Sequence, residues 1–238
     1  MFGRLRTKAA MALIAALAAM PAVAHAGAIG GLFNTGVDGS GMPLGNGAAE
    51  IHYTLANAPD GATTSLRVAT SANGYPVGYW SGDNNASAWI GPNSGPSLDG
   101  PSGTYDYQTT FDLSGLNAQR ASISGLWSAD NTGVDILLNG VSTGNKADGF
   151  GSFYNLAINS GFVDGVNTLD FIVDNAGGMD SPTGLRTELV GRADVPEPAT
   201  MALLRARPEI NALIRSKISE LYQGVKVIEF DHLSPDDP

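Results

Sequence analysis

The most restrictive feature of this sequence is a long region of short apolar or alternating runs, each bounded by Gly, Asn, Asp or Pro. Between Ala28 and Asp194, no 11-residue window carries the apolar stripe of an amphipathic helix, which argues against parallel strands joined by crossover helices. Alternation is clearest where Tyr105, Tyr107 and Phe111 recur at even spacing. We expect strands over residues 50–56, 64–70, 104–113, 121–127, 133–140, 168–174 and 184–191.

Many short strands separated by turn residues are typical of two antiparallel sheets packed face to face. The sequence therefore predicts an all-β fold, an antiparallel β-sandwich or jelly roll, with a short C-terminal helical tail. No repeat of fixed period is visible, which argues against a propeller. About 170 residues are enough to bury the core of one domain, so we expect residues 27–194 to form a single domain.

Residues 1–26 have the three parts of a secretory signal peptide, namely a basic start, an apolar run and small residues before a cleavage point. The basic and small residues are Arg4, Arg6, Lys8, Ala24 and Ala26. A buried N-terminal helix is the alternative, but the combination favours cleavage after Ala26. The protein is therefore expected in the cell envelope or secreted to the extracellular space.

Composition excludes several functions. Removal of residues 1–26 leaves ten basic and 23 acidic side chains, a net charge of −13. A nucleic-acid partner requires a basic face, so no such partner is expected. The chain has no cysteine, which excludes disulfides, thiol chemistry and zinc sites built on cysteine.

The charge composition of the sequence changes near residue 200. Residues 27–199 carry five basic and 17 acidic side chains, whereas residues 201–238 carry five and six. In this tail Pro208 suits the first turn of a helix and Gly224 suits its end, while Val225, Val227 and Phe230 alternate as in a short strand. The apolar residues that share one face of the expected helix are Ile210, Leu213, Ile214, Ile218, Leu221 and Tyr222.

A sorting motif precedes the tail. The run VPEPATMALL at residues 195–204 resembles the PEP-CTERM sorting signal of Gram-negative bacteria through Pro196, Glu197 and Pro198. In that family the motif precedes a transmembrane helix and a basic end, and an exosortase processes the signal, usually in organisms that make exopolysaccharide. The resemblance implies an exported surface or biofilm protein with an exosortase as a partner.

The chain departs from this family directly after the motif. A membrane-spanning helix needs about 20 apolar residues, but only residues 199–204 precede Arg205, and Arg207 and Glu209 follow. We therefore expect no transmembrane anchor in this chain. Residues 205–238 are interpreted as an unrelated amphipathic helix-strand tail that replaced the anchor, either solvated or lying at a membrane interface.

The body carries a second resemblance. The run GLWSADNTGVDILLNGVSTG at residues 125–144, followed by NTLDFIVDNAGG and PTGLRTELVG, is similar to the final strands of galactose-binding-like jelly rolls found in PEP-CTERM proteins. The similarity covers residues 104–191. It implies a fold more strongly than a ligand.

The best candidate binding loop is residues 75–92, which concentrates aromatic and amide side chains. Aromatic faces can stack on the C–H surface of a sugar while neighbouring polar groups bind its hydroxyls. The alternative is that the two tryptophans fill the core and the polar residues form a turn. The candidate ligand-binding residues are Tyr79, Trp80, Asp83, Asn84, Asn85 and Trp89.

Metal and catalytic candidates are weaker. Carboxylate and carbonyl oxygens suit calcium, and the pairs Asp130 with Asn131 and Asp174 with Asn175 are the candidate ligands of a structural calcium ion. A plain turn is the alternative at both pairs, because no Asp-x-Asp-x-Asp-Gly run is present. His52 could serve a catalytic triad but lies in an expected strand, and no other cofactor is expected.

These observations favour a protein without enzymatic activity that binds extracellular polysaccharide. Two alternatives stay open, a purely structural component of a surface or biofilm matrix and a polysaccharide-acting hydrolase. The hydrolase would need two carboxyl groups about 5 to 10 Å apart across a cleft, which spacing in the sequence cannot establish.

Overall fold

The computed structural model describes residues 26–92, 98–196 and 207–222. Contacts divide the chain into two units, one comprising Ala24–Pro196 and the other comprising residues 1–23 and 197–238, and each is described by itself. All strands in the described residues belong to the first unit. Ala24, Glu197 and Pro198, together with the strand expected over residues 225–230, lie outside the described residues.

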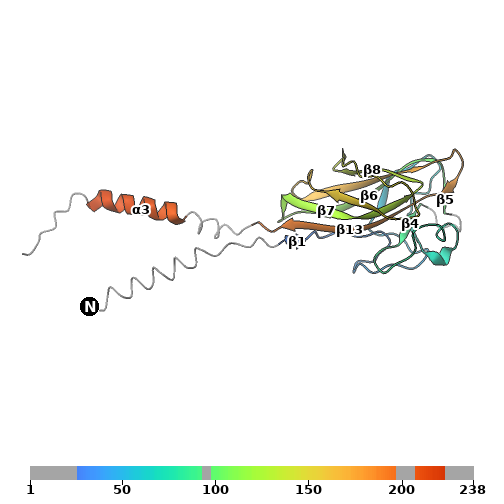
Figure 1. Ribbon diagram of the computed structural model, residues 1–238, viewed down its shortest axis with the longest axis horizontal. Helices are drawn as coiled ribbons and strands as arrows, with labels where there is room; N and C mark the ends of the chain where they lie inside the picture. Colours follow the sequence, from blue (N-terminus) through green and yellow to red (C-terminus); the bar gives the residue numbers. More distant parts are fainter. Residues whose placement is uncertain (1–25, 93–97, 197–206, 223–238) are drawn as a thin grey trace, which may run out of the picture. The chain divides into compact units, whose positions relative to one another are not determined.

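The first unit contains two large antiparallel sheets (Figure 1). One sheet has the order β10-β7-β13-β4-β3, with β1 also paired to β13, and the other has the order β2-β6-β11-β8-β9. Strands of the first sheet are β1 (Ala26–Ala28), β3 (Arg67–Ala69), β4 (Trp89–Gly91), β7 (Asn117–Asp130), β10 (Tyr154–Ile158) and β13 (Gly184–Asp194). Strands of the second are β2 (Thr54–Asn57), β6 (Gly103–Asp112), β8 (Thr132–Leu138), β9 (Val141–Ser142) and β11 (Val166–Asn175).

Two smaller elements lie outside these sheets. The short strands β5 (Asp99–Gly100) and β12 (Ser181–Pro182) pair with each other, and a 3₁₀ turn, η1 (Ser71–Asn73), follows β3. All strand pairings in the described part of the chain are antiparallel. The structure therefore confirms the predicted all-β antiparallel sandwich.

The main core lies between the two large sheets because alternate residues of their long strands are apolar. On β6 and β11 the inward side chains include Tyr107, Phe171 and Val173, each fully buried. They meet β7 from the opposite sheet, where the Trp127 ring lies 5.7 Å from the Phe171 ring, centroid to centroid. Burial of such aromatic rings is the largest apolar contribution that a core of this kind receives.

Each of the seven residue ranges expected to form a strand does contain one, but the first two strands are shorter than predicted. Residues 50–53 form a bend because the Glu50 carboxylate accepts hydrogen bonds from the backbone N–H groups of four residues. These residues are Gly36, Ile51, His52 and Tyr53. The expected strand position of His52 is therefore wrong: its ring stacks on Phe33 with centroids 3.7 Å apart.

The second unit contains the predicted tail helix, α3 (Arg207–Tyr222), with Pro208 in its first turn. Ile210, Leu213 and Ile214 are exposed on it, and Lys217 forms an ion pair with Glu220 at 2.7 Å. Among the described helices, none is long and apolar enough to cross a membrane.

The fit of Trp127 against β8 generates a stability prediction. A methyl group added at Gly133 would overlap Trp127 Cη2 and lie 3.0 Å from Ala147 Cβ. Because all these groups are packed in the core, Gly133→Ala is expected to lower the free energy of unfolding by about 1 to 3 kcal/mol. Urea unfolding measures this, with Gly151→Ala as the control, since a methyl group there meets nothing within 4 Å. Equal stability of the two variants would contradict the packing described here.

Candidate functional site

The predicted binding residues lie in the β3–β4 loop (residues 70–88) and at the start of β4. This loop covers the outer face of the first sheet. On β13, Leu185 and Leu189 point into the main core, so Arg186 and Glu188, at the alternate positions, point to the opposite face. Both of these side chains contact the loop.

Trp80 and Trp89 form a second, smaller core beneath this loop with Ala69, Val77 and Leu98. The exposed fraction of Trp80 is 5 % and that of Trp89 is 0 %, and the two rings are 4.4 Å apart, centroid to centroid. In this conformation neither ring offers a face to a ligand. The expectation that they stack on a sugar is corrected, because both indole rings pack between the loop and the sheet instead.

Arg186 fastens the loop to the sheet. Its guanidinium is fully buried and donates hydrogen bonds to the backbone oxygens of Ser81, Gly82 and Ser87, at 2.9, 2.6 and 3.1 Å. Its Nε also donates to Ser87 Oγ at 2.8 Å. Charged hydrogen bonds of this kind are the strongest polar contacts in proteins, and here they tie three carbonyl groups of the loop to β13.

The predicted polar residues have mainly internal roles. Asp83 Oδ2 accepts hydrogen bonds from the N–H and the hydroxyl of Ser71, at 2.9 and 2.6 Å, and so ties the loop to η1. Asn84 Oδ1 accepts from the N–H groups of Ala86 and Ser87, while its amide donates to Glu188 Oε1 at 2.6 Å. Asn85, the residue after Asn84, is exposed to solvent.

Tyr79 is the predicted aromatic residue that does face solvent, with 73 % of its surface exposed. Tyr75, which the sequence analysis did not select, is 57 % exposed and lies beside it, with ring centroids 6.0 Å apart and ring planes at 72°. We call these two residues the tyrosine pair. The sequence signal for Tyr75 was present in the run YPVGYW, where aromatic residues flank a Pro-Val-Gly turn.

The turn that carries the tyrosine pair has both buried and exposed side chains. Val77 and Trp80 are buried, whereas Tyr75 and Tyr79 are exposed. Backbone hydrogen bonds close the turn, from Tyr79 N to Pro76 O at 2.8 Å and from Trp80 N to Val77 O at 3.2 Å. The exposed rings are thus carried by a backbone whose neighbouring side chains are fixed in the second core.

Asp130 links the second core to β7. Its Oδ2 accepts a hydrogen bond from Trp80 Nε1 at 2.8 Å, while its Oδ1 is buried without a hydrogen-bond partner. Only 3 % of the residue is exposed, and burial raises the pKa of Asp130 to about 6 despite the hydrogen bond from Trp80.

The four candidate calcium ligands lie at the ends of neighbouring strands. The backbone N–H of Asn131 donates to Asp174 O at 3.1 Å, and Asn131 Oδ1 accepts from Ala176 N at 2.8 Å. Asn175 is fully buried and its amide donates to Gly100 O at 2.9 Å. Within the described ranges, no group of three or more His, Cys, Asp or Glu side chains could hold a metal ion. Calcium binding at these residues stays a prediction.

Two further carboxyl groups interact on the outer face of the second sheet. Asp170 lies opposite Gln108 and accepts its amide hydrogen bond at 2.7 Å, and Asp106 lies diagonally across on β6. Burial, and then the negative charge of Asp170, raise the pKa of Asp106 to about 6. The aromatic residues Tyr105, Tyr107 and Phe171 of β6 and β11 point into the core, so they leave no stacking ring on this face.

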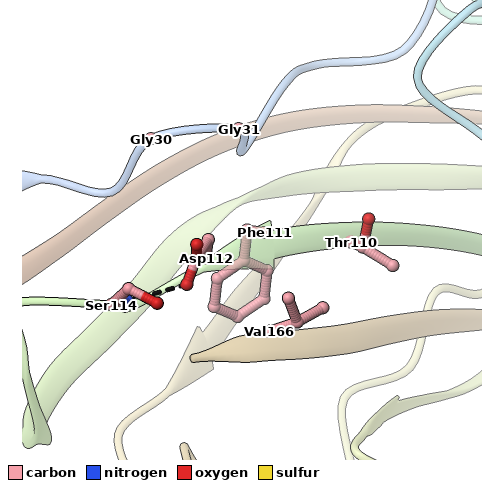
Figure 2. Close-up of a pocket in the computed structure, with 7 residues that line it drawn as sticks. All are labelled: Gly30, Gly31, Thr110, Phe111, Asp112, Ser114 and Val166. Carbon is pink, nitrogen blue, oxygen red and sulfur yellow. Dashed lines mark hydrogen bonds between the residues drawn. The ribbon is translucent and has the colours of Figure 1, made fainter. Parts of the chain in front are cut away.

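Two surface pockets of about 330 and 320 Å³ lie away from the tyrosine pair. In the larger one (Figure 2) Phe111 and Val166 lie next to each other, while Asp112 Oδ1 accepts a hydrogen bond from Ser114 N at 2.7 Å. The contacts with Ser114 lower the pKa of Asp112. The smaller pocket is bounded by Val141 and Asn159 among other residues. Neither pocket is lined by an exposed aromatic side chain or by a predicted site residue.

No protein-family model matches this chain, and no curated protein matches it. Among solved structures, it is similar to the CBM36-1 domain of a multidomain xylanase from the hindgut metagenome of Trinervitermes trinervoides, with 16% sequence identity and a TM-score of 0.28. That match covers 48% of this chain and 84% of the other. A TM-score this low supports no conclusion about the fold or the site, which are established by the strands and side chains described above.

Arg186 provides a test of how the loop is held. Arg186→Ala removes the buried guanidinium and its charged hydrogen bonds to three loop carbonyl groups, and is expected to lower the free energy of unfolding by about 3 kcal/mol. Arg192→Ala is the matched control because Arg192 lies on the same strand but is exposed, so its loss should change stability by less than about 0.5 kcal/mol. Chemical unfolding followed by tryptophan fluorescence measures both. A loss no larger than that of the control would show that Arg186 does not hold the loop.

The two raised carboxyl pKa values predict that acid stabilises the fold. In the unfolded chain Asp106 and Asp130 release their protons near the ordinary value of 3.8, whereas in the folded chain they keep them to about pH 6. The folded state therefore binds more protons between these values, and the free energy of unfolding should fall as the pH rises through this window. Thermal unfolding should occur at a higher temperature at about pH 5 than at about pH 7.5.

Substitution tests the origin of that pH dependence. Asp130→Asn keeps an oxygen for Trp80 Nε1 and removes the charge, so it should raise the free energy of unfolding at about pH 7.5 by about 1 kcal/mol and reduce the difference between the two pH values. Asp164→Asn is the control because Asp164 is exposed. If Asp130→Asn left the pH dependence as steep as the control did, Asp130 would not be its source.

Proposed function

We propose that this protein is a non-catalytic carbohydrate-binding module that is exported and binds extracellular polysaccharide through the tyrosine pair. The observation that carries the proposal is the pair of exposed aromatic rings on a loop whose other aromatic residues are buried. Tyrosine suits this task because it presents a rigid apolar face and a polar hydroxyl, which match the C–H surface and the hydroxyls of a sugar ring.

The construction of the loop supports a binding role. A ligand that stacks on a mobile side chain must pay for ordering it, whereas a ring carried by a fixed backbone binds with less loss of entropy. Here the fixed backbone comes from Trp80 in the second core and from Arg186 beneath residues 81–87. Asn85 is exposed, and we propose it as a polar contact to the sugar.

The setting of the proposed activity comes from the sequence. The signal peptide, the Pro-Glu-Pro motif and the acidic composition favour an exported protein of the cell envelope or extracellular matrix in a Gram-negative bacterium. We propose exopolysaccharide as the ligand, an exosortase as the processing partner, and calcium at Asp130, Asn131, Asp174 and Asn175 as a structural ion. A role as matrix material alone and a hydrolytic role are the outcomes against which binding is tested.

The experiment is retention of the full chain on immobilised bacterial exopolysaccharides, with and without calcium. Tyr79→Ala should weaken retention about tenfold, which corresponds to the loss of about 1.4 kcal/mol of stacking. Tyr79→Phe keeps the ring and should retain most of the binding. Val163→Ala is the remote control because Val163 is also exposed but lies in the loop before β11.

The outcomes separate the three functions. Retention that depends on Tyr79 and leaves the polysaccharide intact supports a binding module. Retention with release of shorter sugars would instead favour a hydrolase, and Asp106→Asn and Asp170→Asn would then identify its carboxyl groups. Absence of retention on every polysaccharide, by a folded protein, would favour a purely structural role.

A further inference from the structure

The relative orientation of the two exposed rings limits the kind of polysaccharide that can bind. Tyr75 and Tyr79 do not lie in one plane: their planes make an angle of 72° at a centroid separation of 6.0 Å. In this edge-to-face arrangement one ring directs its edge toward the other, so the open faces of the pair are nearly perpendicular.

The backbone that carries both rings is held by hydrogen bonds of its own. Asn73 Nδ2 donates to Tyr75 O at 3.0 Å, and Gly78 N donates to Gly74 O at 2.9 Å. The next residue after Tyr79 is the buried Trp80, whose indole N–H donates a hydrogen bond to Asp130. These contacts fix the positions of the two residues, and the edge-to-face contact favours the observed angle between their rings. To bring the two rings into one plane, a ligand would have to break that contact, which costs binding energy.

The flat surface of a crystalline polysaccharide and a single hydrated polysaccharide chain would contact these two rings differently. The surface of a crystalline polysaccharide is a plane, so it can lie against one open face of the pair at a time. A separate hydrated chain twists along its length, so successive sugar units can present their apolar faces in different directions. Only the separate chain can use both rings together.

We infer that the tyrosine pair selects separate, hydrated polysaccharide chains over crystalline polysaccharide surfaces, and that Tyr75 is a second binding residue that acts together with Tyr79. This inference rests on the proposed carbohydrate-binding function. It assigns a class of ligand, the soluble or gel-forming chain, and it adds a residue that the loop sequence alone did not single out.

The test compares the full chain on two physical forms of the same polymer. The probes are acid-swollen and microcrystalline cellulose, colloidal and crystalline chitin, and a panel of soluble bacterial exopolysaccharides. On every hydrated polymer that binds, Tyr75→Ala and Tyr79→Ala should each weaken binding about tenfold, and crystalline forms should bind more weakly than the hydrated forms. Both side chains are exposed, so the variants should unfold at the wild-type temperature.

Each result has a separate meaning. Binding to a crystalline form that equals or exceeds binding to the hydrated form, and that requires Tyr79, would overturn the inference and leave the proposed function intact. Binding that requires Tyr79 but is unchanged by Tyr75→Ala would also overturn it. If Tyr79→Ala had no effect on binding to any probe, both the inference and the proposed site would be lost.

Discussion

The arrangement of the whole loop region depends on one buried cation. Arg186 lies on the outer face of the first sheet, and its hydrogen bonds to the carbonyls of Ser81, Gly82 and Ser87 hold a segment that has no regular secondary structure. The desolvation of its guanidinium is offset by these bonds and by the Phe153 ring, 5.1 Å from Arg186 Cζ. Burial lowers the pKa of Arg186 from its ordinary value, but the neighbouring carboxylate of Glu188 opposes this shift. These bonds hold residues 81–87 against the face of the sheet on which Trp80 and Trp89 form the second core.

The fold was largely predictable because its long strands are half buried. In β6 and β11 the residues at even spacing are apolar and buried, so alternation in the sequence indicates both the strand and its inward face. β4 was not predicted, because Trp89, Ile90 and Gly91 are all buried between the main core and the loop. Its sequence therefore shows no alternation of apolar and polar residues. The bend at Glu50 was also not predicted. It is formed by a carboxylate that accepts four backbone hydrogen bonds, and such bonds do not change the hydrophobic periodicity of the sequence.

The candidate loop could be selected from the sequence, but the direction of its side chains could not be predicted. Residues 75–92 concentrate aromatic residues, yet composition could not tell which rings face inward. Trp80 donates a hydrogen bond to Asp130, 50 positions away, and the loop above the two tryptophans is held by Arg186, 99 positions from Ser87. Such long-range contacts leave no signal in the local sequence pattern. The direction of Tyr75 and Tyr79 follows from the same packing, because a turn that buries Val77 and Trp80 leaves their neighbours outside.

The pairing of β1 with β13 has a consequence for how the domain can be attached. Ala26 lies opposite Asp194, so the polypeptide enters and leaves the sandwich at adjacent points of one sheet. In Figure 1 these strand ends lie at one end of the sandwich, whereas η1 and the loop that carries it, drawn in teal, lie at the other. A tether joined at either end of this unit would therefore hold the loop that carries η1 at the end of the sandwich opposite the point of attachment. The same adjacency would let the sandwich be inserted into a loop of a larger host protein without stretching that loop.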